Sequence, residues 1–176
     1  YERFVERCSL RNHVSLSVNN STQKWTDWSD EKYILRFTAI TKMLASNRMT
    51  TIHMRKHPKN KKTMDVLKAE GMLTDEMAAI IKRKQEAGEG FLICGKNGSG
   101  KTTFMNAAIE NIPEQLSIFC VQEAEELFSA SERDFGAYHI IEGRGEVNIN
   151  YSLGDMVTMA QTMDADVIIL GEIKGE

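Results

Sequence analysis

The second half of the chain alternates between short, continuous apolar runs and longer stretches with helical periodicity. The apolar runs at 91–94 ("FLIC"), 116–122 ("LSIFCVQ") and 166–170 ("DVIIL") predict strands, and the stretches at 102–112 and 153–163 predict helices. Strands that alternate with helices favour a parallel sheet with helices on its faces. Because "FLIC" and "VIIL" are apolar at every position, both are expected to be central strands that are buried on two sides.

Three helices carry sequence signals for their ends. Thr63 and Thr74 can cap two helices that Gly71 and Gly88 end, and Ser152 can cap the helix before the last strand. The second of these helices has an amphipathic stripe, which we expect to pack beneath the sheet rather than to read DNA. The stripe consists of Met77, Ile80, Ile81 and Lys84.

The first third of the chain predicts a separate small domain. Residues 1–54 contain the β-rich pieces "HVSLSVNN" and "MTTIHM", together with a segment, "SDEKYILRFTAITKMLA", for which Ser29 is the expected helix cap. Pro58 and the lysines around it interrupt this periodicity. The predicted organisation is therefore an α/β domain over 1–54, a basic linker over 55–62, and an α/β core over 63–176.

Composition narrows the class of protein. The chain has 176 residues, of which 41% are apolar and 27% charged, and no run approaches the roughly 18 apolar residues of a spanning helix. We therefore expect a cytoplasmic protein. The three cysteines, Cys8, Cys94 and Cys120, lack metal-ligand spacing and fit a reducing compartment. The net charge of −3 gives no general attraction to nucleic acid, so the basic run "MRKHPKNKK" favours a solvated linker over a nucleic-acid contact.

A phosphate-binding loop follows the "FLIC" run. The pattern G-x-x-x-x-G-K-[ST] is met by Gly95, Gly100, Lys101 and Thr102. Glycines let backbone N–H groups close around an anion, the lysine bridges terminal phosphates, and the threonine hydroxyl holds Mg²⁺. We therefore expect Mg²⁺ and ATP as ligands. The expected nucleotide-binding residues are Gly95, Lys96, Asn97, Gly98, Ser99, Gly100, Lys101, Thr102 and Thr103.

Hydrolysis would also need acids at the ends of neighbouring strands. Glu172 follows "DVIIL", which places a carboxylate at the carboxyl edge of the sheet, and it is the first candidate for catalysis and for a metal contact. The residue before it is Gly171 rather than an aspartate, so metal coordination there would run through water. The second candidate is the acidic turn "QEAEEL", represented by Glu123, although a solvated turn explains these residues equally well.

The order of these motifs along the chain is similar to that of a known family. The segments "ICGKNGSGKTTFMNAAIENIP", "VQEAEELFS", "EGRGEV" and "DADVIILGEIKGE" resemble those of the type II/type IV secretion ATPases, from about Thr50 onward. The branch that serves pilus assembly and conjugation-like secretion looks most similar. The resemblance implies a RecA-like P-loop core with a small N-terminal α/β domain. It also implies an ATP-hydrolysing hexameric ring that works at the inner face of the plasma membrane with membrane platform proteins.

Carried over by position, the family's acidic box falls on residues 122–126, where the first acid is replaced by Gln122. An amide can orient a water but cannot take its proton, so the role of general base moves to Glu123 or Glu172. The run "TIHMRK" is similar to the family segment that closes the N-terminal domain. That similarity makes Arg55 a candidate cation on the phosphate side.

Two departures from the family pattern affect function. Thr162 and Asp164 stand where the family often has arginines, so transition-state charge would be stabilised by Arg144 or by a neighbouring subunit. The family's histidine box lies downstream of Glu172, and none of the four histidines can replace it by position. The predicted strands are also fewer than a RecA-like core needs, so we expect these residues to be part of a longer protein.

Two other functions remain open from the sequence. A DNA-tracking RecA-like motor would use the basic run and the helix pair and would be stimulated by DNA. A nucleotide-sensing module that does not hydrolyse ATP is favoured by Gln122 and by the missing arginines. Of the aromatic residues, Trp25 and Trp28 fit packing of the N-terminal domain better than stacking on adenine. Met156, Met159 and Met163 fit core filling.

Overall fold

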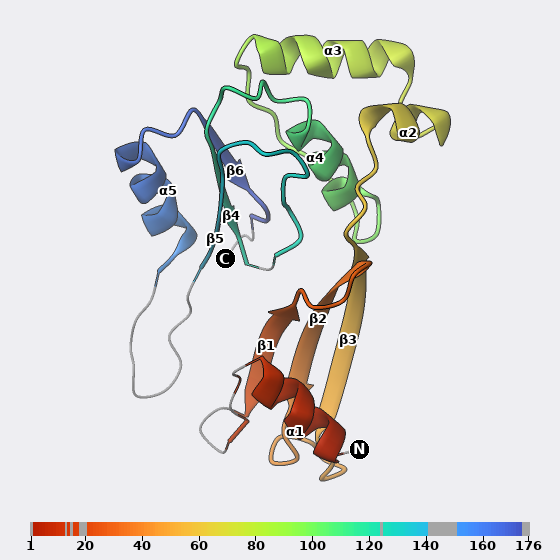
Figure 1. Ribbon diagram of the computed structural model, residues 1–176, viewed down its shortest axis with the longest axis vertical. Helices are drawn as coiled ribbons and strands as arrows, with labels where there is room; N and C mark the ends of the chain where they lie inside the picture. Colours follow the sequence, from red (N-terminus) through yellow and green to blue (C-terminus); the bar gives the residue numbers. More distant parts are fainter. Residues whose placement is uncertain are drawn as a thin grey trace. The chain divides into compact units, whose positions relative to one another are not determined.

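The computed structural model describes residues 2–12, 14, 16–17, 21–123, 125–140 and 151–173. They form two compact units (Figure 1), one that includes the residues up to Asn60 and one that begins at Lys61. None of the helices in this part of the chain is long and apolar enough to cross a bilayer. The expectation for "HVSLSVNN" falls largely outside the described residues, and Arg144 lies outside them too.

The first unit is a three-stranded antiparallel sheet with one helix. Its elements, in chain order, are α1 (Glu2–Arg11), β1 (Thr22–Asp27), β2 (Tyr33–Ile40) and β3 (Thr51–Pro58). Trp25 stacks on Phe37 of the neighbouring strand with ring centroids 5.1 Å apart, and Cys8 of α1 packs against this cluster. Packing in the N-terminal sheet, as predicted, explains Trp25.

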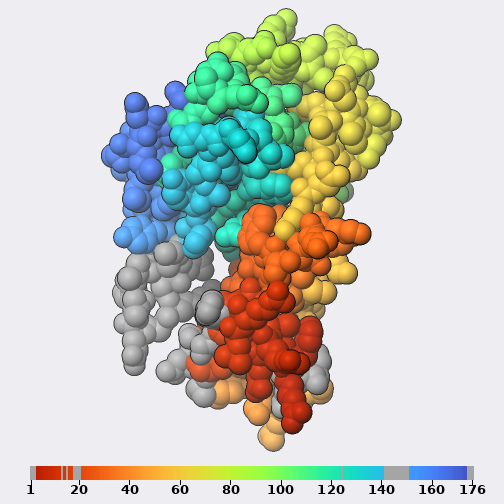
Figure 2. All heavy atoms as spheres, viewed as in Figure 1, coloured from red at the N-terminus to blue at the C-terminus, as the bar shows by residue number. Residues whose placement is uncertain are grey.

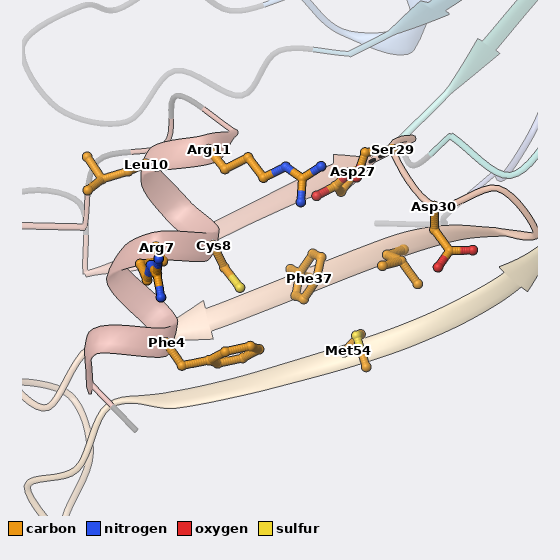
Figure 3. Close-up of a pocket in the computed structure, with 11 residues that line it drawn as sticks. Phe4, Arg7, Cys8, Leu10, Arg11, Asp27, Ser29, Asp30, Phe37 and Met54 are labelled. Atoms are coloured by element: carbon orange, nitrogen blue, oxygen red, sulfur yellow. Dashed lines mark hydrogen bonds between the residues drawn. The ribbon is translucent and has the colours of Figure 1, made fainter.

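A groove remains between α1 and this sheet, as Figure 3 shows. Phe4 and Cys8 line it from the helix, and Phe37 and Met54 line it from the strands. The helix therefore covers only part of the apolar face of the sheet.

The helix predicted after Ser29 is wrong, because this segment is strand β2. Asp27 accepts a hydrogen bond from the N–H of Ser29, and Asp30 accepts from the N–H groups of Lys32 and Tyr33. The expected cap is thus part of the turn between β1 and β2. Apolar residues within "YILRFTAI" recur at every second position on the face that meets α1, which is the period of a strand, and cross-strand packing decides the outcome.

Strand β3 also runs farther than the sequence predicts. Residues 55–58, expected to be linker, continue the strand, and Pro58 at its end pairs in register with Tyr33. Proline is tolerated here because it ends an edge strand of the sheet. The turn signal at Pro58 therefore marks the end of a strand and not an irregular linker.

The second unit holds a parallel sheet with helices on both faces, which confirms the predicted α/β class with a small N-terminal sheet unit. The strand order is β5 (Phe135–His139), β4 (Ile118–Gln122) and β6 (Val167–Leu170). Its helices are α2 (Met64–Ala69), α3 (Asp75–Glu86), α4 (Lys101–Ile109) and α5 (Leu153–Thr162).

Strand β4 is buried along its whole length between two helices. Ile118 and Cys120 face a cluster that includes Ile109 of α4, whereas Phe119 and Val121 face a cluster that includes Met156 of α5. The strand thus presents alternate residues to two apolar layers, as a central parallel strand does.

The prediction that "FLIC" is a central strand is wrong. Residues 91–94 form no strand, and the side chains of Phe91 and Leu92 are 49% and 74% exposed. "VIIL" does form β6, but at an edge of the sheet and with Ile168 partly exposed. A run of four apolar residues gains strand structure only by pairing with a neighbour, and periodicity cannot show whether that neighbour is present.

The helix ends agree with the sequence, whereas the apolar stripes agree only in part. Thr63, Thr74 and Ser152 are confirmed as caps, the last within a capping box with Asp155, and Gly71 and Gly88 have φ values of 75° and 70°. Helix α3 packs through Ile81 and Gln85 against α2 and α4 rather than beneath the sheet, and it has no fully buried residue; its outer side lies at the surface in Figure 2. The methionines at 77, 159 and 163 are exposed, contrary to the expected core roles.

We expect the thiol of Cys120 to resist alkylation in the native protein at about pH 8, while Cys94 reacts. Burial raises the pKa of Cys120 to about 12, so little thiolate forms, whereas Cys94 is exposed. Mass spectrometry of peptides after brief labelling measures both sites, with Cys94→Ser as the control for the fast reaction. Labelling of Cys120 at equal rates with and without denaturant would contradict the described core.

Candidate nucleotide-binding site

The predicted phosphate-binding loop forms a tight turn at the start of α4. Gly98 and Gly100 have φ values of 76° and 90°, a left-handed backbone conformation that residues other than glycine rarely adopt. Gly100 is also the N-cap of α4, and it provides no side-chain hydrogen bond to the first turn. The first N–H groups of α4 and the positive end of its dipole are therefore suited to an anion.

Two glycines of the loop have close neighbours. A Cβ atom at Gly95 would lie 2.6 Å from the hydroxyl oxygen of Ser99, and one at Gly100 would lie 2.8 Å from the terminal methyl of Met72. The N–H of Ser99 donates to the carbonyl of Lys96 and closes the turn. Because the two neighbouring atoms end side chains that can rotate, the positive φ values at Gly98 and Gly100 are the stronger reason for glycine in this loop.

Lys101, the first residue of α4, folds back over this turn. Its Nζ donates to the carbonyl oxygens of Gly95 and Lys96, both at 2.9 Å. The ammonium group is therefore held at the loop by neutral acceptors. An anionic phosphate is a stronger acceptor than a carbonyl oxygen, so these two bonds can be exchanged for contacts with a ligand at the same loop.

Among the acidic candidates, the structure brings Glu126 to the loop. The hydroxyl of Thr102 lies 3.4 Å from Oε2 of Glu126, to which it can donate. The backbone of Glu126 is held on both sides, because its N–H donates to Oε1 of Gln122 and its carbonyl accepts from Nδ2 of Asn106. The sequence placed Glu126 in the acidic turn but favoured Glu123. The structure places Glu126, and not Glu123, beside Thr102. The only signal for this in the sequence is the position of Glu126 four residues after Gln122, at the end of the acidic box.

Gln122 has a structural task in the acidic turn. Its side chain is buried, with Oε1 accepting from the N–H groups of Glu126 and Leu127 and Nε2 donating to the carbonyl of Leu127. Both lone pairs of the amide oxygen are thereby used. The amide oxygen therefore holds the turn in this arrangement, and the water-orienting role of Gln122 stays a prediction.

The packing around Gly171 explains why no aspartate precedes Glu172. Gly171 follows β6, and its N–H donates to the carbonyl of Val121 at 2.8 Å. A Cβ atom at this position would lie 2.9 Å from Cβ of Gln122 and 3.4 Å from the backbone of the same residue. No side chain, and therefore no aspartate, fits at Gly171 while Gln122 keeps its place.

The remaining predicted residues lie in different parts of the molecule. Glu172 is exposed just beyond β6, at the same carboxyl edge as Gln122 of the parallel neighbour β4. Glu123 directly follows β4. Arg55 belongs to the first unit, where it pairs in register with Arg36. Within the described ranges, no group of three or more His, Cys, Asp or Glu side chains is arranged to hold a metal ion.

Comparison with known proteins assigns the chain to a family. Residues 29–176 match the family model described as "Type II/IV secretion system protein". The chain belongs to the type II/IV secretion system protein family. This finding confirms the resemblance inferred from the P-loop, the acidic turn and the "GEIKGE" segment.

Individual relatives match a smaller part of this chain than the family model does. The "Putative conjugal transfer protein" of Mycobacterium tuberculosis is 31% identical over 112 residues, which is 62% of this chain and 31% of that protein. An uncharacterized protein of Methanocaldococcus jannaschii is 27% identical over 106 residues, which is 60% of this chain and 39% of that protein. The chain thus spans about a third of the length of these curated relatives.

Among solved structures, the crystal structure of the VirB11 ATPase from the Brucella suis type IV secretion system, in complex with sulphate, shows a weak likeness. It is 14% identical with a TM-score of 0.44, and the match covers 99% of this chain and 56% of that one. The family assignment rests on the family model.

We expect Gly171→Ala to destabilise the protein by about 1–3 kcal/mol, because the added methyl group meets Cβ and the backbone of Gln122. Gly90→Ala is the matched control, since a Cβ atom there meets nothing within 4 Å. Urea denaturation of the two variants and of the wild type measures the difference. Equal stability of both variants would show that the strand ends are not packed as described.

Proposed function

We propose that this chain binds Mg-ATP at the loop formed by residues 95–103 and hydrolyses it as the motor of a secretion, pilus-assembly or conjugation-like system. The observation that supports this most strongly is the combination at α4. Two glycines in the left-handed conformation precede α4, and no side chain caps the first turn of this helix. Thr102 and Glu126 lie beside that turn. These are the features that phosphate binding and metal-assisted hydrolysis require.

The residues at the loop have distinct roles in this proposal. Backbone N–H groups of the loop and of the first turn of α4 bind the phosphates, and Lys101 exchanges its bonds to Gly95 and Lys96 for contacts with the terminal phosphates. Lys96, Asn97 and Ser99 complete the wall of the turn. Magnesium, when bound, neutralises charge on the phosphates and orients them.

The hydroxyl of Thr102 is suited to bind the metal, because it lies beside the carboxylate of Glu126. Together they offer two oxygen ligands of the type that magnesium prefers. Glu126 would hold the metal through this pair or through water. Glu172 and Glu123, each just beyond the carboxyl end of a strand, are the acids available to orient and deprotonate the attacking water. Arg55 stays a proposed cation on the phosphate side.

The assembly is also a proposal. On the family resemblance, we propose a homo-oligomeric, hexameric ring in the cytoplasm, peripheral to the inner membrane, that works with membrane platform proteins. A neighbouring subunit would then supply the arginine that stabilises charge in the transition state.

A second candidate function has its own support. The acidic turn begins with Gln122, whose side-chain amide is hydrogen-bonded within the turn, so no acid stands at this position to take a proton from water. A nucleotide-sensing module that binds ATP without hydrolysing it would have this composition. Tight ATP binding together with no phosphate release by the full natural protein would favour this candidate over the motor.

Phosphate release by the full natural protein tests the motor. We expect Lys101→Ala to lose ATP binding, and Glu126→Gln and Glu172→Gln to bind ATP but to turn over roughly 10²-fold or more slowly. Glu114→Gln, an exposed acid in the connection that follows α4, is the control and should keep the wild-type rate. Equal rates in all five proteins would remove the assigned chemistry.

A further inference from the structure

Helix α4 carries a polar stripe that faces the segment after the acidic turn. The stripe consists of Thr102, Asn106 and Glu110, the residue that caps the helix end, which are spaced by four and so lie on one side of the helix. All three make contacts with residues 126–131, which we call the acid segment. The helix that begins at the phosphate loop is thus joined along its length to the segment that holds Glu126.

Asn106 and Glu110 hold the backbone of the acid segment. Asn106 donates to the carbonyl of Glu126 at 2.9 Å and lies 3.4 Å from the N–H of Phe128. Oε1 of Glu110 accepts from the N–H of Ala130 at 2.8 Å, and Oε2 accepts from the hydroxyl of Ser131 at 3.3 Å. Each turn of the helix therefore fixes a successive part of the segment.

Lys61 completes this arrangement from the start of the second unit. Its Nζ lies 3.2 Å from Oε1 of Glu110 and 4.1 Å from the ring centroid of Phe128, and its side chain is 5% exposed. Its ammonium group thus contacts both the end of α4 and the acid segment. Lys61 lies within residues 59–63, which connect β3 to α2, so it attaches this connection to the end of α4.

Burial makes this ion pair different from an ordinary surface pair. Burial lowers the pKa of Lys61, although the charge of Glu110 opposes the shift. Burial, the largest single influence, acts to raise the pKa of Glu110, but the hydrogen bond from the N–H of Ala130, the charge and hydrogen bond of Lys61 and the charge of Arg133 lower the pKa overall. Removing either partner alone would leave a charge in a poorly solvated place.

We propose that Lys61 is a positioning residue for the acid segment, fastening the connection of residues 59–63 to α4 so that movement of this connection shifts Glu126 relative to the phosphate loop. This inference rests on the proposed function and adds a route by which the N-terminal unit could regulate hydrolysis. The route is physically continuous from Lys61 through Glu110 and the acid segment to Glu126 and Thr102.

The neighbouring residue offers a matched control. Lys62 forms an ion pair with Glu70 at 2.6 Å, but both side chains are 47% exposed, and neither the phosphate loop nor the acid segment is part of this pair. Lys61→Met and Lys62→Met thus remove the same charge from adjacent positions. The double variant Lys61→Met/Glu110→Gln neutralises both buried partners and avoids the unpaired carboxylate that could prevent folding of the single variant.

The first measurement is amide hydrogen exchange of residues 126–131 in the full natural protein without nucleotide. We expect Lys61→Met, and the double variant, to speed exchange there by about tenfold, because the segment loses one of its attachments. Lys62→Met should match the wild type. Wild-type exchange in Lys61→Met or in the double variant would overturn the inference whatever the enzyme activity, so this arm does not depend on ATP hydrolysis.

The second measurement separates positioning from simple stability. We expect the double variant to recover thermal stability relative to Lys61→Met while kcat stays about tenfold low and KM for ATP stays within about twofold of the wild type. If kcat returned together with stability, Lys61 would have a structural role and the inference would be wrong. If the wild type showed no turnover, the motor proposal would fail, and the exchange measurement would still decide the role of Lys61.

Discussion

Gln122 ends the central strand of the second unit in a buried position, and its side-chain amide holds the backbone of the turn that follows. Two N–H groups and one carbonyl of Glu126 and Leu127 are paired with it. Buried backbone groups without such partners would cost free energy, so the conformation of the turn depends on this residue. The position of Glu126 beside Thr102 depends in turn on that conformation.

The amide at 122 suits this turn better than the acid that stands first in the family's acidic box. A carboxylate at 122 could accept from the two N–H groups but could not donate to the carbonyl of Leu127, so glutamine satisfies one more buried group than an acid would. Its backbone and Cβ then occupy the space beside Gly171, where a side chain would collide. An acid at 122 would place the same Cα and Cβ there, so this contact explains the glycine at 171, and the hydrogen bond to Leu127 separately favours the glutamine.

The sequence predicted best the features that are set by neighbouring residues. Helix caps such as Thr63 and Ser152 and the glycine-dependent loop at Gly98 and Gly100 follow from local hydrogen bonding and backbone conformation, and the structure has all of them. Features that need a distant partner were less predictable. "YILRFTAI" has a period that fits a strand, but only pairing with β1 and β3 decides it, and "FLIC" does not pair in the described residues.

The candidate site shows the same division. The loop around Lys101 was identified from spacing alone, whereas the choice among the acids of "QEAEEL" depended on which one the turn directs toward α4. Strand β5 was also missed, since "FGAYH" has little apolar alternation and contains a glycine over which Tyr138 packs. So short a strand, with a glycine at its second position, leaves little periodic signal in the sequence.

The acid segment is held from two layers of the unit. The sheet fixes the N–H of Glu126 through Gln122, and the helix that begins at the phosphate loop fixes the carbonyl of the same residue through Asn106. A shift of α4 relative to β4 must therefore strain or break one of these hydrogen bonds, so the Thr102–Glu126 contact reports the alignment of helix and sheet. Because Glu110 continues the attachment to the far end of α4, where Lys61 binds, that alignment can respond to a residue well outside the phosphate loop. The packing that stabilises the core is, for this reason, also what sets the geometry of the candidate site.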